Sequence, residues 1–288
     1  MKISKNFHFL YGLFSANVGI IKSFEEVALI DSGFTEESVD TIVSYLELIE
    51  GLDKVKYVFL THGDPDHIGG AHRFQREYGA KVVIHEKEID RIQNPPPYIC
   101  PSKADIAIDQ DRTFQVGRLQ IRLIPTPGHS AGSICIYVKK QGILFTGDTI
   151  VGPSFSLRAP LSEYERNTYT MLPIRAGVDT YLTSLRNLCR IKSKWLLPGH
   201  GKPVFKKTHA TIASTIRSVE GLKGKLCSLL DEELCPSELA VRLNIHESLV
   251  KEIVDELVNE GLVIFAKERC VKKEPFYKRA DVPPCSKA

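Results

Sequence analysis

Runs of hydrophobic residues along the first 200 positions predict a mixed α and β fold. Short strand-like runs separated by turn residues fill positions 1–33. Helical periodicity follows Thr35, the expected N-cap, and continues to about Glu50. A continuous apolar, β-branched run at 55–60 is typical of a strand that is buried on both faces. This alternation of helix and strand predicts helices layered on sheets.

The same alternation continues up to position 197. Positions 151–177 contain glycine, proline and aromatic residues without clear periodicity, which indicates a long loop of the kind that often carries function. The remaining helices are expected at 69–79, 86–93 and 178–192, and the remaining strands at 81–85, 105–116, 118–125, 133–139, 143–147 and 195–197.

The pattern changes at about Gly221 to short amphipathic helices. Residues 236–261 predict a helix, a turn and a second helix, and the apolar run at 262–265 predicts a hairpin strand. This order resembles a winged helix-turn-helix. We therefore predict a first domain over residues 1–220 and a winged-helix-like domain over residues 221–288.

The charge of this C-terminal part argues against DNA reading. Residues 221–288 contain eleven lysines and arginines and twelve aspartates and glutamates, so the net charge is close to zero. A helix that reads DNA normally presents a basic face. We expect a structural role for this domain, bordering the active site or making a contact between subunits.

Composition is that of a globular protein, with 43% hydrophobic and 25% charged residues. A net charge of +3 is too small to imply a nucleic-acid or membrane partner. The apolar run at 7–14 follows two lysines, but His8 and Gly12 interrupt it, so we expect a cytoplasmic protein rather than a secreted one. The seven cysteines are scattered without a Cys-x-x-Cys pair, which favours neither a disulfide framework nor a thiolate zinc site.

Potential metal ligands are concentrated directly after the predicted strand at 55–60. Four of them fall within six residues, and three more follow strand-like runs, each beside a glycine. A ligand at a strand end is held by a rigid sheet while its side chain faces an open rim. The seven candidates are His62, Asp64, Asp66, His67, His129, Asp148 and His200.

The chemistry of this set indicates a dinuclear centre. Imidazole and carboxylate together suit zinc, manganese or iron, whereas calcium prefers oxygen alone. Seven ligands exceed what one tetrahedral ion takes, but two ions that share a carboxylate, roughly 3.5–4 Å apart with a bridging hydroxide, would use them all. Asp148 is the candidate bridge. We expect two divalent ions per chain, zinc first and manganese or iron as alternatives.

The ordered motifs His-x-Asp-x-Asp-His, Gly-His-Ser, Gly-Asp-Thr and Gly-His-Gly resemble the signature of the metallo-β-lactamase superfamily over residues 1 to about 220. The resemblance implies an αββα sandwich. It also implies two ligand sets and a role for Asp66 in proton transfer. The first metal would take His62, Asp64 and His129, and the second Asp66, His67 and His200.

Asp64 departs from the commonest version of the first motif, which has histidine there. A carboxylate is harder and adds a negative charge, so the first site favours manganese or iron more than a three-histidine site would. Flavodiiron reductases also have an acidic residue at this place. They append a flavodoxin domain, however, and nothing after residue 220 resembles one.

The resemblance implies a hydrolase that uses a metal-bridging hydroxide on an ester, thioester or lactone. One alternative is an endoribonuclease or phosphodiesterase, because some endoribonucleases of this fold have a similar C-terminal tail and the basic residues between 272 and 279 could meet phosphates. A diiron redox enzyme is a further alternative. We expect a small-molecule substrate and no membrane partner, and leave RNA and self-association open. Residues of the long loop that would contact the substrate are Arg158, Tyr164, Tyr169 and Arg175.

Overall fold

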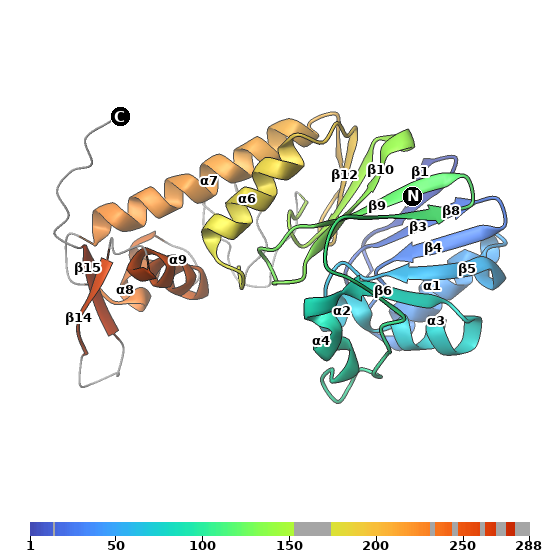
Figure 1. Cartoon of the computed structure of the whole chain (residues 1–288), viewed down its shortest axis with the longest axis horizontal. Helices are drawn as coiled ribbons and strands as arrows, with labels where there is room; N and C mark the ends of the chain where they lie inside the picture. The colour runs from blue at the N-terminus through green and yellow to red at the C-terminus, as the bar shows by residue number, and fades with distance from the viewer. Residues whose placement is uncertain are drawn as a thin grey trace.

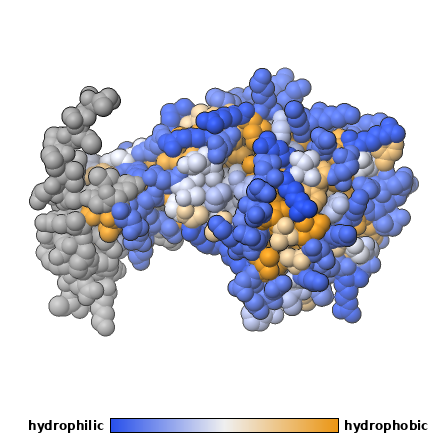
Figure 2. All heavy atoms as spheres, viewed as in Figure 1, coloured by the Kyte–Doolittle hydropathy of each residue, from blue (hydrophilic) through white to orange (hydrophobic). Residues whose placement is uncertain are grey.

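We describe a computed structural model of the chain over residues 1–13, 15–152, 174–230, 234–243, 247–259, 263–268 and 275–279. Its larger part is a sandwich of two sheets, and a long helix leads from it to a smaller helical unit at the opposite end of the molecule (Figure 1). The surface seen in Figure 2 is mainly hydrophilic, with smaller hydrophobic patches. Among the described residues, no helix is both long and apolar enough to cross a membrane.

The first sheet follows chain order from β1 to β7, with antiparallel pairs up to β4 and parallel pairs from β4 to β7. Parallel neighbours need crossover connections, and helices supply most of them. The strands are β1 (Lys2–Ser4), β2 (Phe7–Leu10), β3 (Val18–Ser23), β4 (Glu26–Ile30), β5 (Val55–Phe59), β6 (Lys81–His85) and β7 (Ile106–Ile108). The helical segments are α1 (Glu36–Leu48), η1 (Leu52–Lys54), α2 (Pro65–Ile68), α3 (Ala71–Tyr78), η2 (Glu86–Glu88) and α4 (Ile89–Gln93).

The second sheet has the order β13-β12-β11-β10-β9-β8, and only the pair β11 with β12 is parallel among its described pairings. Helix α6 lies on the path between these two strands. The elements are β8 (Arg112–Val116), β9 (Leu119–Pro125), β10 (Ile134–Val138), η3 (Lys139–Gln141), β11 (Ile143–Gly147), α6 (Val178–Cys189), β12 (Trp195–Pro198) and β13 (Val204–Phe205).

Three apolar clusters define the layers. One lies between the two sheets and contains Phe59 and Phe145, both fully buried. A second joins the outer face of the first sheet to α1 and α3, and a third joins the outer face of the second sheet to α6 and α7. The layers therefore run helix, sheet, sheet, helix, which confirms the αββα sandwich expected from the sequence.

One predicted strand was wrong in detail. The run at 105–116 is two strands, because β7 pairs with β6 in the first sheet whereas β8 pairs with β9 in the second. The chain passes from one sheet to the other at residues 109–111. The N-cap was predicted correctly, since the Thr35 side chain accepts a hydrogen bond from the Ser38 N–H at the start of α1.

The C-terminal unit contains α8 (Pro236–Leu243), α9 (Glu247–Asn259) and the antiparallel pair β14 (Val263–Glu268) with β15 (Pro275–Arg279). Helix α7 (Thr208–Leu229) reaches it from the sandwich without interruption (Figure 1). Gly221, the predicted boundary, thus lies inside a continuous helix. The division into two domains and the winged-helix resemblance stay predictions.

Candidate metal centre

The candidate ligands gather where strands of both sheets end. His62 follows β5, His129 follows β9, Asp148 follows β11 and His200 follows β12. Strands β4 and β5 are parallel, and so are β11 and β12, so the carboxyl ends within each pair lie at the same edge of their sheet. Donor atoms of His62, from the first sheet, and His129, from the second, lie within 4.8 Å of each other, so the two edges form one rim. The remaining ligands, at positions 64, 66 and 67, lie in the turn into α2 and within it.

Donor atoms of the seven residues form three overlapping groups, and within each group the atoms lie within 4.8 Å of one another. The overlaps are His62, shared by the first two groups, and His67, shared by the last two. The groups are His62 with Asp64 and His129, then His62 with His67 and Asp148, then Asp66 with His67 and His200.

Asp148 occupies the middle of the set. One of its oxygens, Oδ1, is 3.3 Å from His67 Nε2, and the other, Oδ2, is 3.4 Å from His200 Nε2 and 3.8 Å from His62 Nε2. A carboxylate in this position touches both predicted ligand sets. This is the arrangement expected of a bridging ligand.

Several of these atoms are buried without a hydrogen bond within the part of the chain that the structure describes. They include His62 Nε2, His67 Nε2 and Asp148 Oδ1. Leaving a buried polar atom unsatisfied costs about 1–3 kcal/mol each, so native proteins rarely do it without a ligand or water. Imidazole nitrogens and carboxylate oxygens aimed at a common centre fit a site that binds metal ions.

Gly199, next to His200, lies too close to other candidate ligands to carry a side chain. A Cβ atom at Gly199 would lie 2.4 Å from Asp148 Oδ1 and 2.9 Å from His67 Cε1. Any side chain there would displace a candidate ligand. The crowding of the ligands is therefore the reason for a glycine beside His200.

Asp31 belongs to the site although it is not among the candidate residues predicted from the sequence. Its Oδ2 is 2.8 Å from His67 Nδ1, and its carboxylate also accepts hydrogen bonds from the backbone N–H and the hydroxyl of Thr61 at 2.8 and 2.9 Å. These contacts turn His67 so that its Nε2 faces the other ligands. The available signal was a carboxylate directly after the apolar strand β4.

Glu88 is a second residue that the sequence interpretation missed. Its side chain is buried and joins two ligand-bearing loops, because Oε2 accepts from the Gly63 N–H at 3.0 Å and Oε1 from the Gly132 N–H at 2.9 Å. A Cβ atom at Gly132 would lie 2.6 Å from Glu88 Cγ. Glu88 therefore fixes the loop after His62 relative to the loop after His129.

Two guanidinium groups meet at Asp64. Arg91 forms an ion pair with its Oδ1, and Arg175 lies 3.0 Å from the same oxygen. His129 Nε2 is 3.1 Å from Oδ2. Burial alone would raise the pKa of Asp64, but the hydrogen bond with His129 and the nearby ring of His62 outweigh it and hold the pKa far below its usual range. Asp64 is therefore a carboxylate at neutral pH.

On the other side of the site, His200 and Asp148 form a pair of opposite charges. Burial would lower the pKa of His200, but the charge and hydrogen bond of Asp148 raise it to about 9. The pKa of Asp148 lies well below its usual value, because the charges of His200 and His67 outweigh its burial. A metal ion would replace the protons on these imidazoles, so binding is expected to release protons.

Of the residues predicted to contact the substrate, only Arg175 lies in the described part. Its backbone N–H donates to the His129 carbonyl at 3.3 Å, and the next N–H, of Ala176, donates to the Gly128 carbonyl at 3.0 Å. The segment that leads into α6 thus lies against a ligand loop. Arg158, Tyr164 and Tyr169 lie outside the described residues.

Comparisons with known proteins agree with this architecture. A family model described as the metallo-beta-lactamase superfamily matches residues 11–200. The chain is 27% identical over 208 residues to thioesterase pkgB of Emericella nidulans, covering 72% of this chain and 52% of that protein. It is 30% identical over 192 residues to the probable metallo-hydrolase YybB of Bacillus subtilis, covering 64% and 80%.

Some solved structures align over nearly the whole chain, C-terminal unit included. The metallo-beta-lactamase family protein TTHA1429 of Thermus thermophilus aligns with a TM-score of 0.74 at 21% identity, over 96% of this chain and all of that one. At this identity the match speaks for the fold alone. The chain spans about half the length of the thioesterase relative, 52%, so that similarity concerns part of the relative only.

Proposed function

Because the chain belongs to the metallo-beta-lactamase superfamily, we propose that it is a metal-dependent hydrolase acting on an ester, thioester or lactone. The observation that carries the proposal is the gathering of seven imidazole and carboxylate side chains at one rim of the sandwich. Their inward atoms are buried and include nitrogens without a hydrogen bond among the described residues.

In this proposal the ligand sets are those expected from the sequence. His62, Asp64 and His129 would hold a first ion and Asp66, His67 and His200 a second, with Asp148 lying between the two sets. When bound, the two ions supply a hydroxide nucleophile at neutral pH and positive charge for the oxygen that becomes negative in the reaction. Zinc is our first choice of metal, with manganese or iron as alternatives.

The protein's own groups would prepare this chemistry. Asp31 holds the ring of His67, and Glu88 holds the two loops that bring His62 and His129 together. Asp66 is the most exposed of the three ligand carboxylates, with 33% of its side chain accessible, and its Oδ2 lies 3.2 Å from His200 Nε2. Its pKa is lowered, because the charges of His67 and His200 outweigh its burial, so Asp66 is a carboxylate at neutral pH. Its exposure places it where it could exchange a proton with a bound substrate.

The substrate class rests on the relatives and on the hydroxide chemistry. A thioesterase is among the similar proteins, which favours a thioester or another activated carbonyl compound. We therefore favour a small molecule over RNA as the substrate. The predicted substrate contacts at Arg158, Tyr164 and Tyr169 stay part of the proposal.

The test combines metal content with turnover. Elemental analysis of the purified, tag-free protein is expected to give two divalent ions per chain, and a panel of esters, thioesters, lactones and RNA is then assayed. His62→Ala and Asp148→Ala are expected to abolish turnover while circular dichroism stays unchanged, since the apolar clusters do not include either side chain. His72→Ala, outside the ligand set, is the control and should retain activity.

The outcomes separate the alternatives. A purified protein that contains mainly iron would favour the redox alternative. A protein that cleaves RNA and none of the other substrates would favour the endoribonuclease alternative. Loss of folding in both ligand variants would mean that the metals are structural. Failure to bind any metal, even after reconstitution, would overturn the proposal.

A further inference from the structure

A second hollow of the molecule carries concentrated positive charge. It lies between η3, the segment that joins α6 to β12, and the start of α7, and its volume is about 640 Å³. We call it the basic hollow. Its charged lining residues are Lys139, Lys140, Arg190, Lys192 and Lys194.

The positive charge in the basic hollow is not balanced. Its four lysines and its arginine are exposed, and the lining contains no aspartate or glutamate. In the described part of the chain none of these five side chains forms an ion pair with a carboxylate. Several cations held close together without a counter-charge attract an anion.

The start of α7 adds to this attraction. Thr208 and His209 belong to the lining, and the helix that they begin runs for 22 residues. Its N-cap, Lys207, makes no side-chain capping hydrogen bond, and its first turn contains no acidic residue. The first N–H groups of such a helix are suited to phosphate, because the helix dipole and the free donors both favour a negative ligand.

The wall also contains a polar atom that lacks a partner. Ser193 Oγ is buried and makes no hydrogen bond within the described residues. The backbone around it is fixed, since the Thr208 hydroxyl donates to the Ser193 carbonyl at 2.7 Å and the Lys194 N–H donates to the Gly142 carbonyl at 2.7 Å. The basic side chains, the start of α7 and Ser193 therefore belong to three segments that hydrogen bonds connect to one another.

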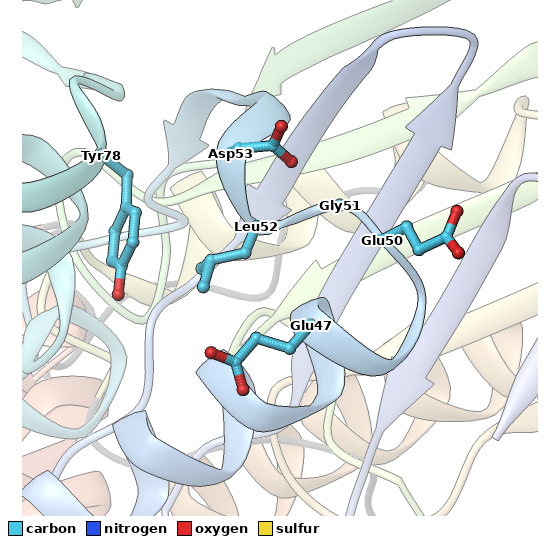
Figure 3. Close-up of a pocket in the computed structure, with 6 residues that line it drawn as sticks. All are labelled: Glu47, Glu50, Gly51, Leu52, Asp53 and Tyr78. Atoms are coloured by element: carbon cyan, nitrogen blue, oxygen red, sulfur yellow. The ribbon is translucent and has the colours of Figure 1, made fainter.

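The basic hollow is separate from the candidate metal centre. Lys194 precedes β12 whereas His200 follows it, and six residues of extended chain span roughly 20 Å. It also differs from a smaller hollow of about 340 Å³ between the end of α1 and Tyr78. There Tyr78, Leu52 and Glu47 face one another and the charged residues are acidic (Figure 3).

We propose that the basic hollow binds a phosphate-bearing ligand of about nucleotide size. Phosphate groups match a site made of lysines, one arginine and a helix start. The volume lies within the range of roughly 300–1,000 Å³ found for small-ligand sites. The phosphates could belong to a free nucleotide or to a stretch of nucleic-acid backbone, which share this chemistry.

Binding to three probes tests the proposal: inorganic tripolyphosphate, ATP and a labelled single-stranded oligonucleotide. The full chain is expected to bind at least one of them, and Lys192→Gln with Lys194→Gln should weaken that binding about tenfold. Lys139→Gln with Lys140→Gln, on a different segment, should act in the same direction. The control, Lys81→Gln with Lys103→Gln, removes the same charge from exposed positions on the side of the first sheet and should leave the affinity unchanged.

The probes distinguish the two sources of phosphate. Tight binding of tripolyphosphate and ATP without the oligonucleotide indicates a free nucleotide or polyphosphate. Tighter binding of the oligonucleotide indicates a nucleic-acid backbone. The slope of log binding constant against log salt concentration should then decrease in magnitude by about one for each lysine removed. Absence of binding to all three probes, or an equal loss in the control variant, would overturn the proposal. Thermal unfolding curves establish that each variant is folded.

Discussion

Glu256 of α9 accepts hydrogen bonds from the backbone N–H groups of Val178 at 2.5 Å and Asp179 at 2.7 Å. The C-terminal unit therefore supplies the cap of α6, whose own N-cap, Gly177, has no side chain to provide one. The residue before that cap, Ala176, bonds to the loop of His129. A helix of the C-terminal unit is thus connected, through a short stretch of backbone, to a candidate metal ligand.

This cap predicts a measurable effect on stability. Glu256→Ala removes both acceptors from the start of α6 and is expected to lower the free energy of unfolding by about 1 kcal/mol. Asp255→Ala is the matched control, because it removes an exposed carboxylate from the same helix. Urea denaturation measures both. Equal changes in the two variants would mean that the capping contact has no specific effect.

Asp31 should control the affinity of the second metal site. Asp31→Asn weakens the hold on His67 Nδ1 without disturbing the backbone, since asparagine tolerates the left-handed conformation that Asp31 adopts at φ 60°. Loss of such a contact typically costs about 10–100-fold in metal affinity. Competition with a chromophoric chelator measures the affinity. Asp53→Asn, remote from the ligands, should bind metal as the unaltered protein does.

Glu88 should contribute to stability through the two loops that it joins. Glu88→Gln replaces one acceptor by a donor, so that one of the N–H groups of Gly63 and Gly132 is left buried without a partner. We expect a loss of about 1–3 kcal/mol in the free energy of unfolding. Glu86→Gln, an exposed neighbour, serves as the control in the same denaturation experiment. An unchanged midpoint for Glu88→Gln would show that the loops do not depend on it.

His8 predicts a pH dependence outside the metal centre. Burial, assisted by the nearby charges of Lys2 and Lys22, lowers the pKa of His8 below its ordinary value of 6.5. The unfolded chain therefore takes up the proton first as the pH falls. The stability contributed by neutral His8 is present above pH 6.5 and is lost as the pH falls through the folded pKa. His8→Gln should show a smaller drop in unfolding free energy between pH 7 and pH 5, and an identical drop would contradict the assignment.

The layers and the seven candidate ligands could be predicted because their signals are local. The buried strand at 55–60 and the run from His62 to His67 are each visible in a few consecutive residues. Asp31 and Glu88 have no such signal. Asp31 contacts His67 across 36 positions and Glu88 contacts Gly132 across 44, so only the folded chain shows what they do.

The run at 105–116 illustrates the same limit. Its two halves have similar strand-forming composition, and nothing in the residues themselves states which sheet each half joins. Pairing with β6 on one side and β9 on the other decides the matter, and these two partners belong to different sheets.

The continuity of α7 sets a constraint on its length. Each residue of a helix adds a rotation of about 100° and a rise of about 1.5 Å. Inserting one residue in the middle of α7 would swing α9 around the helix axis and carry Glu256 away from Val178. A deletion would do the same in the opposite direction. Insertions and deletions should therefore be tolerated in the surface turns of this protein but not between residues 208 and 229.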